Sequence, residues 1–513
     1  MDALTITILQ YRYYIEVLAI VIAALTAISS VDDVFVDLYY WCLRASRKQR
    51  ARERALSDRL QAGAELPERP FAIMVPAWRE SDVIFSMVAT NSRLVVYRNC
   101  HYFIGVYRND QPTSDQVKRI QAFYANVHMV VVPRDGPTSK ADCLNEVIAA
   151  ILDHEVETGI AFAGIALHDA EDFIHPHELK VFNTLIGEFD FVQLPVFSFT
   201  QPIRDTIGGI YMDEFAEVHA KDLIVRDHLS GLIPCAGVSA CFSHNAIVAL
   251  ARENHGEVFQ TGCFTEDYDV AFRLRALDLK STFVSSPVSY TIDIDRESAD
   301  PVYVQRMLPV STREFFPSEL RGAYRQRARW QIGIVFQGTS THGWKGNPGT
   351  RYFLFRDRKG IFTAPIIILG YFALTNLVLI GLYLGFVEPG AQFDYVLLGQ
   401  PYVIDLFFVN VGFLAWRLLH RVIFTVKIYD WRHGMMAVPR LVVANFVNFF
   451  AAVRATRVYV AHRVNGKPLV WDKTSHSYPV KFRSGTATAD AQKRGAASAD
   501  FQPTLQDTRW APQ

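Results

Sequence analysis

The sequence lacks several features by which a function class is most easily recognised. Lysine plus arginine equals aspartate plus glutamate, at 52 each among 513 residues, so no basic excess indicates a nucleic-acid binder. The six cysteines include no C-x-x-C pair, which argues against a cysteine zinc site or a disulfide-stapled fold and suits reduced thiols. Neither G-x-G-x-x-G nor G-x-x-x-x-G-K-[ST] occurs, which weakens dinucleotide-binding and P-loop interpretations. Half of the residues are hydrophobic, which excludes a chain that is disordered as a whole.

The N-terminal region contains an apolar run, and most of the basic residues near this run follow it in the sequence. Val17–Val31 is uncharged, and at about 1.5 Å per residue Tyr13–Val31 approaches the thickness of bilayer hydrocarbon, about 30 Å. A cleaved signal peptide would carry positive charge ahead of this run, where Arg12 is the only basic residue. Lysines and arginines are instead frequent after residue 43. We therefore predict that residues 1–55 form a transmembrane anchor followed by a basic flank. The positive-inside rule places the flank in the cytoplasm and the N-terminus on the other, periplasmic side.

A second apolar region predicts a helical hairpin. Ile361–Val387 is uncharged and follows several basic residues. The loop at 388–401 has no lysine or arginine, and a third run, Tyr402–Trp416, is broken only by Asp405. This alternation is typical of a transmembrane hairpin with cytoplasmic ends, here over residues 361–425.

The segment after the hairpin is apolar but contains arginines. Three of them, Arg440 included, interrupt Met435–Tyr459, and an arginine at the bilayer centre costs about 2.5–3.5 kcal/mol. We expect an amphipathic interfacial segment over 426–482, with a fourth transmembrane span as the alternative. Residues 483–513 are small and polar and predict a disordered tail.

Between these regions, short apolar runs alternate with helical segments. Strands are expected at Phe71–Val75, His101–Tyr107, Val127–Val132, Ala161–Leu167 and Phe191–Phe197. Repeated strand–helix alternation implies a mostly parallel α/β sheet in a domain at 67–300, followed by interface helices at 301–360. Such sheets bind ligands at the carboxyl ends of their strands.

Polar residues follow four of these strands. The most distinctive set is D-A-E-D, Asp169–Asp172, whose three carboxylates would repel one another unless a cation neutralises them. Mg²⁺ and Mn²⁺ prefer oxygen ligands and bridge carboxylates to substrate phosphates. A solvated acidic turn is the plainer alternative, and a zinc site with His168, His175 and His177 is another.

Two further motifs lie downstream. Thr265-Glu266-Asp267 is a second acidic motif, and Gln326, Arg329 and Trp330 fall on one face of a predicted helix. Guanidinium groups bind pyrophosphate and an indole can stack on a sugar ring, although an arginine-rich helix before a membrane span is also a common cytoplasmic flank.

Taken in order, these motifs resemble those of family-2 inverting glycosyltransferases of the membrane-integrated type, which includes cellulose and chitin synthases. The series is V-P-A-W-R-E, Asp110, S-K-A-D-C-L-N, D-A-E-D, T-E-D and Q-R-A-R-W, followed by a membrane hairpin. Six segments resemble more narrowly the bacteriophage adsorption protein B (NfrB) family. They are Val75–Glu80, Gly136–Asn145, His168–Asp172, Thr265–Asp269, Arg329–Gln337 and Trp471–His476.

The resemblance implies a GT-A (Rossmann-like) domain and a role for each motif. It implies nucleotide-sugar contacts by Pro76, Glu80, Asp110, Lys140 and Asp169. It implies Mg²⁺ or Mn²⁺ ligands among Asp169, Glu171 and Asp172, where the glutamate departs from the commoner D-x-D and leaves Glu171 and Asp172 as alternatives. It implies a general base at Asp267, with Glu266 beside it, and pyrophosphate or acceptor contacts by Gln326, Arg329 and Trp330.

The function implied is transfer of a sugar from a UDP-sugar to a growing glycan during exopolysaccharide synthesis, at the inner face of the bacterial inner membrane. The expected partners are the donor, the glycan acceptor, the lipid bilayer and an outer-membrane or periplasmic export protein, with no nucleic acid. Two alternatives remain open at this point: a catalytically idle scaffold or phage-receptor component, and a transferase that places one sugar on a polyprenyl phosphate.

Overall fold

The computed structural model describes residues 3–63, 65–285, 287–293, 303–387, 395–467 and 478. The W-D-K-T-S-H motif, the expected tail at 483–513 and part of the expected 388–401 loop lie outside these residues.

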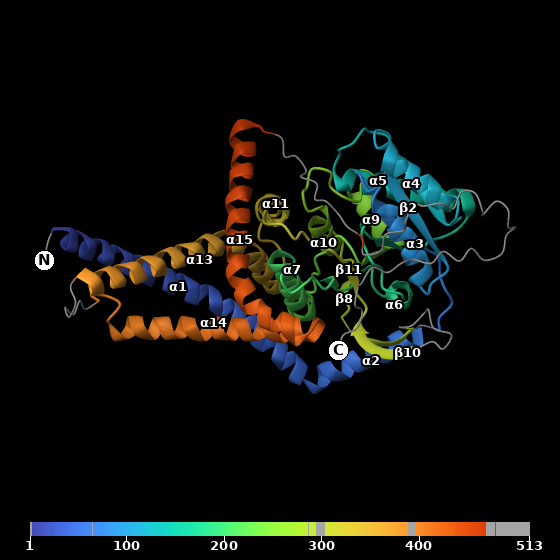
Figure 1. Cartoon of the computed structure of the whole chain (residues 1–513). Coiled ribbons are helices and arrows are strands. Elements are labelled where there is room, and N and C mark those ends of the chain that lie inside the picture. Colours follow the sequence, from blue (N-terminus) through green and yellow to red (C-terminus); the bar gives the residue numbers. More distant parts are fainter. Residues whose placement is uncertain are drawn as a thin grey trace. The chain divides into compact units, whose positions relative to one another are not determined.

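The chain divides into two compact units (Figure 1). We call the first the membrane-helix unit; it comes from Met1–Gln49, Thr200–Ser230 and Pro317–Asp472. The second, the sheet unit, comes from Arg50–Phe199, Gly231–Phe316 and Lys473–Gln513. Thr200–Ser230, which lies inside the expected 67–300 domain, therefore groups with the apolar helices instead.

The sheet unit is built on one seven-stranded sheet of order β3-β2-β1-β4-β7-β5-β8. Its strands are β1 (Phe71–Pro76), β2 (Cys100–Tyr107), β3 (Val127–Val132), β4 (Gly164–Leu167), β5 (Phe191–Gln193), β7 (Ala240–Ser243) and β8 (Ser281–Phe283). Within this sheet only β7 runs antiparallel to its neighbours, β4 and β5. The other pairs are parallel, which confirms the mostly parallel α/β sheet.

Two small sheets accompany the large one. β9 (Pro287–Asp293) pairs antiparallel with β10 (Tyr303–Pro309), and β6 (Val196–Ser198) pairs parallel with β11 (Thr312–Glu314). The run Phe191–Phe197, expected as one strand, is thus divided between two sheets. Pro195 lies at the division, where its missing N–H cannot continue the ladder.

Helix α5 covers one face of the strands at one edge of the sheet. Alternate residues of a strand point to the same face, so His101, Phe103 and Gly105 of β2 share one. Gly105 allows α5 to approach, because a Cβ there would overlap the side chains of Cys143 and Val147. The helices of this unit are α2 (Arg47–Gly63), α3 (Ile84–Leu94), α4 (Gln111–Gln121), α5 (Lys140–Thr158), α6 (Glu178–Leu185), α9 (His244–Glu253) and α10 (Glu266–Ala276).

The membrane-helix unit contains four long helices. They are α1 (Ala3–Ala45), α13 (Pro348–Val387), α14 (Pro401–Ile428) and α15 (Trp431–Asn465). Among the described residues, these four are long and apolar enough to cross a membrane. Figure 1 shows α1, α13 and α14 running alongside one another. The shorter elements are α7 (Thr206–Glu217), the π-helical η1 (Val218–Asp222), α8 (Leu223–Ser230), α11 (Leu320–Gln331), the π-helical η2 (Ile332–Gln337) and α12 (Gly338–His342).

Charged residues of this unit pair inside it. Arg356 lies 2.9 Å from Asp32, and Lys359 lies 2.9 Å from Asp33. Arg440 of α15 is 1% exposed and forms an ion pair with Asp213 of α7 at 3.2 Å. This arginine therefore presents no charge to lipid, which removes one of our reasons for expecting an interfacial helix at 435–459. Whether α15 crosses the membrane or lies on it stays a prediction.

Candidate active site

The first group of predicted site residues lies where β1 and β2 end. Pro76 closes β1 opposite Gly105, and Asp110 directly precedes α4. The Oδ2 of Asp110 accepts a hydrogen bond from the Arg79 N–H at 2.5 Å, and Arg79 has a positive φ of 56°. The Glu80 N–H donates to the Thr113 hydroxyl at 3.0 Å. The loop after β1 and the start of α4 are therefore joined, and they bring Pro76, Glu80 and Asp110 to one corner.

The loop before α5 is anchored to the same corner. Asn109 donates through Nδ2 to the Gly136 carbonyl at 2.6 Å and accepts from the Gly136 N–H at 2.8 Å. The Tyr107 hydroxyl lies 2.7 Å from the Thr138 hydroxyl. Ser139 caps α5 by accepting from the Asp142 N–H at 3.1 Å, a preferred role for serine. These bonds fix the position of Lys140, the first residue of α5.

Lys140 joins the two acidic motifs. Its Nζ lies 2.6 Å from Asp169 Oδ1 and donates to the Gly237 carbonyl at 3.2 Å. Burial lowers the pKa of this ammonium, but the carboxylates of Asp169, Glu266 and Asp267 outweigh burial and raise the pKa above its ordinary value. Lys140 is therefore charged at neutral pH, in a place where three carboxylates from distant parts of the sequence converge.

Within the D-A-E-D motif, the carboxylates have different surroundings. Asp169 is partly exposed, Glu171 is buried, and Asp172 is 0% exposed. Asp172 Oδ2 accepts from the Asp169 N–H at 3.0 Å and lies 2.9 Å from His168 Nδ1. His168 Nε2 is 2.8 Å from Glu178 Oε1. Burial lowers the pKa of His168, but the two carboxylates raise it to about 10.

These contacts give Asp172 a structural role, because it holds the turn together through His168. The assignment of metal ligands among Asp169, Glu171 and Asp172 stays a prediction. The same contacts bear on the zinc alternative, because both ring nitrogens of His168 face carboxylates. Among the described residues, His168, His175 and His177 do not bring ligand atoms together.

The T-E-D motif opens helix α10. Glu266 and Asp267 are in its first turn, where the helix dipole favours negative charge. Asp267 is partly exposed, and its Oδ1 accepts from the Tyr268 N–H at 2.7 Å. Gly237 lies against it with a φ of 80°, and a Cβ there would stand 2.5 Å from Asp267 Oδ2. The turn at Gly237 therefore leaves just enough room for the Asp267 carboxylate.

Two amides that our sequence analysis gave no role hold this arrangement. Gln193 Oε1 accepts from the Ala236 N–H at 2.9 Å, and its Nε2 donates to the Val238 carbonyl at 2.9 Å. Asn145 Nδ2 donates to the Phe259 carbonyl at 2.8 Å, and its Oδ1 accepts from the Phe259 N–H at 2.9 Å. In the sequence, the only sign of these supporting roles is that each amide lies among apolar residues, Gln193 in a strand and Asn145 on a helix.

The third motif lies in the membrane-helix unit, on α11. Gln326, Arg329 and Trp330 are partly exposed. The Trp330 ring is 6.3 Å from the Tyr211 ring. Arg327, between them in sequence, is buried and forms an ion pair with Glu214 at 2.6 Å. The roles of Gln326, Arg329 and Trp330 toward pyrophosphate or acceptor stay predictions.

The carboxylates at the sheet edge are hard oxygen donors of the kind that a divalent cation uses, although among the described residues no three of them bring ligand atoms within 4.8 Å of one another. Asp169, Glu171, Glu266 and Asp267 offer carboxylate oxygens, and one of these oxygens already binds the Lys140 ammonium. Oxygen ligands are what Mg²⁺ and Mn²⁺ prefer.

Known proteins resemble the chain over most of its length. Bacteriophage adsorption protein B of Escherichia coli K12 and bacteriophage N4 adsorption protein B of Escherichia coli O157:H7 are each 38% identical over 484 residues. Each match covers 93% of this chain, which spans 64% of the length of these relatives. A mannosyltransferase of Pyrobaculum calidifontis, solved with GDP-Man and Mn²⁺, is 15% identical with a TM-score of 0.43, covering 77% of this chain and 99% of its own. At that score the likeness adds nothing to the assignment.

The family described as "Glycosyltransferase like family 2" matches residues 67–333, just over half of the chain. These residues include the four strand ends, both acidic motifs and the Q-R-A-R-W motif. The chain therefore belongs to glycosyltransferase family 2.

Proposed function

We propose that the chain transfers a sugar, with inversion, from a UDP-sugar to a growing glycan at the cytoplasmic face of the bacterial inner membrane. One observation carries this proposal: Lys140 binds Asp169 and is surrounded by the carboxylates of Glu266 and Asp267. The expected metal motif and the expected base, about a hundred residues apart in sequence, thus meet at the carboxyl edge of one sheet.

Asp267 is proposed as the general base. A sugar hydroxyl is a poor nucleophile at neutral pH, so a carboxylate must take its proton as the new bond forms. The acceptor oxygen bonds to the anomeric carbon while the bond from that carbon to the diphosphate oxygen breaks, and the electron pair leaves with the nucleoside diphosphate. Attack opposite the leaving group inverts the anomeric centre. A single base suffices, whereas a glycoside hydrolase needs two carboxylates across the bond.

Lys140, Asp169 and Glu171 are proposed to receive the diphosphate end of the donor. Asp169 and Glu171 would hold Mg²⁺ or Mn²⁺, which supplies charge neutralisation for the departing diphosphate. The Lys140 ammonium lies 2.6 Å from Asp169 Oδ1 and is held in place by the Gly237 carbonyl. Asp110, with Pro76 and Glu80, would contact the nucleobase or ribose. Arg329 and Trp330 would contact the pyrophosphate and the acceptor sugar.

The four apolar helices support a membrane location for the transfer. Exopolysaccharide as the product, the inner membrane as the site, a periplasmic N-terminus and an export partner beyond the membrane are parts of the same proposal. They rest on the motif order and on the positive-inside pattern of the sequence.

The test is release of nucleoside diphosphate by the purified full chain in detergent, with a panel of UDP-sugars and either Mg²⁺ or Mn²⁺. We expect metal-dependent release with one donor and a product that remains with polysaccharide. Lipid-extractable labelled product would instead support sugar transfer to a polyprenyl phosphate. Absence of release with every donor would support the idle scaffold and contradict the proposal.

A further inference from the structure

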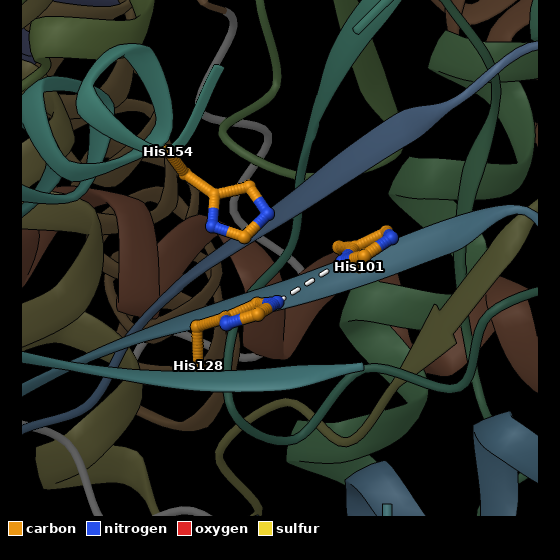
Figure 2. Close-up of side chains that lie close together, drawn as sticks. All are labelled: His101, His128 and His154. Carbon is orange, nitrogen blue, oxygen red and sulfur yellow. Dashed lines mark hydrogen bonds between the residues drawn. The ribbon is translucent and has the colours of Figure 1, made fainter. Parts of the chain in front are cut away.

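Three histidines gather at the other end of the strands that carry the active-site loops. His101 is the second residue of β2, His128 is the second residue of β3, and His154 lies near the end of α5. One ring nitrogen from each lies within 4.8 Å of the others. Figure 2 shows the His154 ring, which comes from the helix, facing the two strand-borne rings. Within the described residues, no other group of histidine, cysteine or carboxylate side chains meets this geometry.

The three rings are held in place by packing. His101 and His128 stack at 5.3 Å with their planes 9° apart, and His101 Nδ1 lies 3.0 Å from His128 Nε2. The His128 and His154 rings are 4.6 Å apart. Phe103 and Phe162, both almost fully buried, contact this group from the sides. The sheet register and α5 therefore fix three imidazoles whose positions in the sequence are far apart.

The pKa values of His101 and His128 suit metal binding. Burial and the neighbouring imidazoles lower the pKa of His128 to about 4 and lower that of His101 as well. Neutral imidazole is the form that binds transition metals. The Nε2 of His154 is buried and has no hydrogen-bond partner among the residues that the structure describes. An aromatic cluster formed for packing alone would leave this nitrogen unsatisfied, which buried polar atoms normally avoid.

We propose that His101, His128 and His154 form a binding site for a transition-metal ion of the Zn²⁺ class, separate from the Mg²⁺ or Mn²⁺ site of the transfer reaction. Zinc binds imidazole nitrogens at about 2.0–2.1 Å, and three histidines with a water in the fourth position are an established set. Nitrogens at that distance from one tetrahedral ion are about 3.3–3.4 Å from each other. The three ring nitrogens now lie within 4.8 Å of one another, so the rings would have to move closer together around the ion. His101 Nδ1 and His128 Nε2, which now share a hydrogen bond, would both bind the ion. Each neutral ring then carries its single proton on the other ring nitrogen, so metal binding releases no net proton. The ion would tie β2, β3 and α5 together.

The site lies far from the transfer chemistry. Tyr107 lies six positions after His101 on β2, which at about 3.3 Å per residue is roughly 20 Å. The imidazole set also differs in chemistry from the carboxylate set, because nitrogen ligands select Zn²⁺, Co²⁺ or Ni²⁺ over Mg²⁺. The ion is therefore proposed to stabilise the sheet unit without taking part in the transfer.

The experiment is a Co²⁺ titration of the tag-free full chain in detergent, followed by visible absorption and performed in excess Mg²⁺ to occupy the carboxylate site. We expect one equivalent of Co²⁺ to give the d–d absorption bands that are typical of a Co²⁺ site with low coordination number. Added Zn²⁺ should displace the Co²⁺ and remove these bands. His154→Gln should weaken Co²⁺ binding by more than about a hundredfold. Mutation of residues that only hydrogen-bond to metal ligands already lowers metal affinity by about 10–100-fold, and loss of a ligand should cost more. His255→Asn is the control, because His255 is exposed and its positive φ of 53° suits asparagine.

A second measurement keeps the proposal falsifiable if a variant folds poorly. Zn²⁺ should raise the unfolding temperature of the wild type and of His255→Asn and leave that of His154→Gln and His128→Gln unchanged. No Co²⁺ bands in the wild type, or equal binding by wild type and His154→Gln, would overturn the proposal.

Discussion

The two ends of β2, β3 and α5 carry opposite kinds of chemistry. At one end, Lys140 and the neighbouring loops meet the carboxylates of Asp169 and Asp267, where charge is concentrated and partly exposed. At the other end, three imidazoles pack against phenylalanines, and burial lowers the pKa of two of them. Parallel strands make this separation possible, because all their carboxyl ends meet at one edge and all their amino ends at the other. One set of elements can therefore present a hard oxygen site and a nitrogen site without mixing them.

The largest expected effect comes from removing the base at the charged end. Asp267→Asn keeps the shape of the side chain but cannot take a proton, so we expect the turnover number to fall by about 10²–10⁴-fold. Nucleoside diphosphate release measures it. Asp153→Asn, an exposed position on α5, is the matched control and should be unaffected. Normal turnover in Asp267→Asn would assign the base elsewhere.

Crowding the same carboxylate should be the next most damaging change. Gly237→Ala forces a Cβ against Asp267 Oδ2 and strains a φ of 80°, so turnover should fall by up to about a hundredfold through misplacement of the base. Gly159→Ala separates the two causes. Gly159 ends α5 with a φ of 72° but has open space around its Cβ position, so this variant carries the backbone strain alone. Equal loss of turnover in both variants would show that strain, rather than contact with Asp267, is responsible.

Removing a buried support should lower stability more than it changes the chemistry. Gln193→Leu deletes the bonds to the Ala236 N–H and the Val238 carbonyl and leaves the buried Val238 carbonyl without this donor, at a cost of about 1–3 kcal/mol in the free energy of unfolding. Thermal or denaturant unfolding measures the difference. Gln61→Leu, on an exposed face of α2, should change stability little. A stable Gln193→Leu variant with normal activity would show that the 235–239 turn does not need this amide.

The smallest effect is expected at the imidazole end. In chelator-treated protein supplied only with Mg²⁺, His154→Gln should turn over within about twofold of the wild type, because the histidines lie roughly 20 Å from the transfer chemistry. The same assay of nucleoside diphosphate release applies. A large loss would mean that the two ends are coupled.

The residues of the charged end carry a local signal in the sequence, and the roles given to them stay predictions. D-A-E-D follows an apolar strand directly, and T-E-D directly begins a helix, so each motif could be recognised without knowing the other. The family is confirmed, and so are the mostly parallel sheet and the apolar helices at the N-terminus and toward the C-terminus. The Q-R-A-R-W motif on α11 has a local signal of the same kind, and its contacts with pyrophosphate or acceptor stay predictions.

The remaining features depend on which distant segments meet. Histidines 101, 128 and 154 have no metal-ligand spacing in the sequence, and neither the missing C-x-x-C pairs nor the histidines near D-A-E-D point to them. Gln193 looks like one polar residue in a strand until the 235–239 turn is placed beside it. The bond of Asp172 to His168 cannot be read from the order of residues, and the choice between Glu171 and Asp172 as a metal ligand stays a prediction. Pro195, in contrast, could have indicated that Phe191–Phe197 is two strands.

The most direct measurement is equilibrium binding of UDP to the full chain in Mg²⁺, comparing Asp169→Asn with His154→Gln. If the nucleotide site is formed by Lys140, Asp169 and their neighbours at the carboxyl edge, Asp169→Asn should weaken UDP binding by at least about tenfold, since a ligand of the cation that bridges to the diphosphate is lost. His154→Gln should bind UDP as the wild type does. Undiminished binding by Asp169→Asn, together with weakened binding by His154→Gln, would contradict the assignment of the two ends.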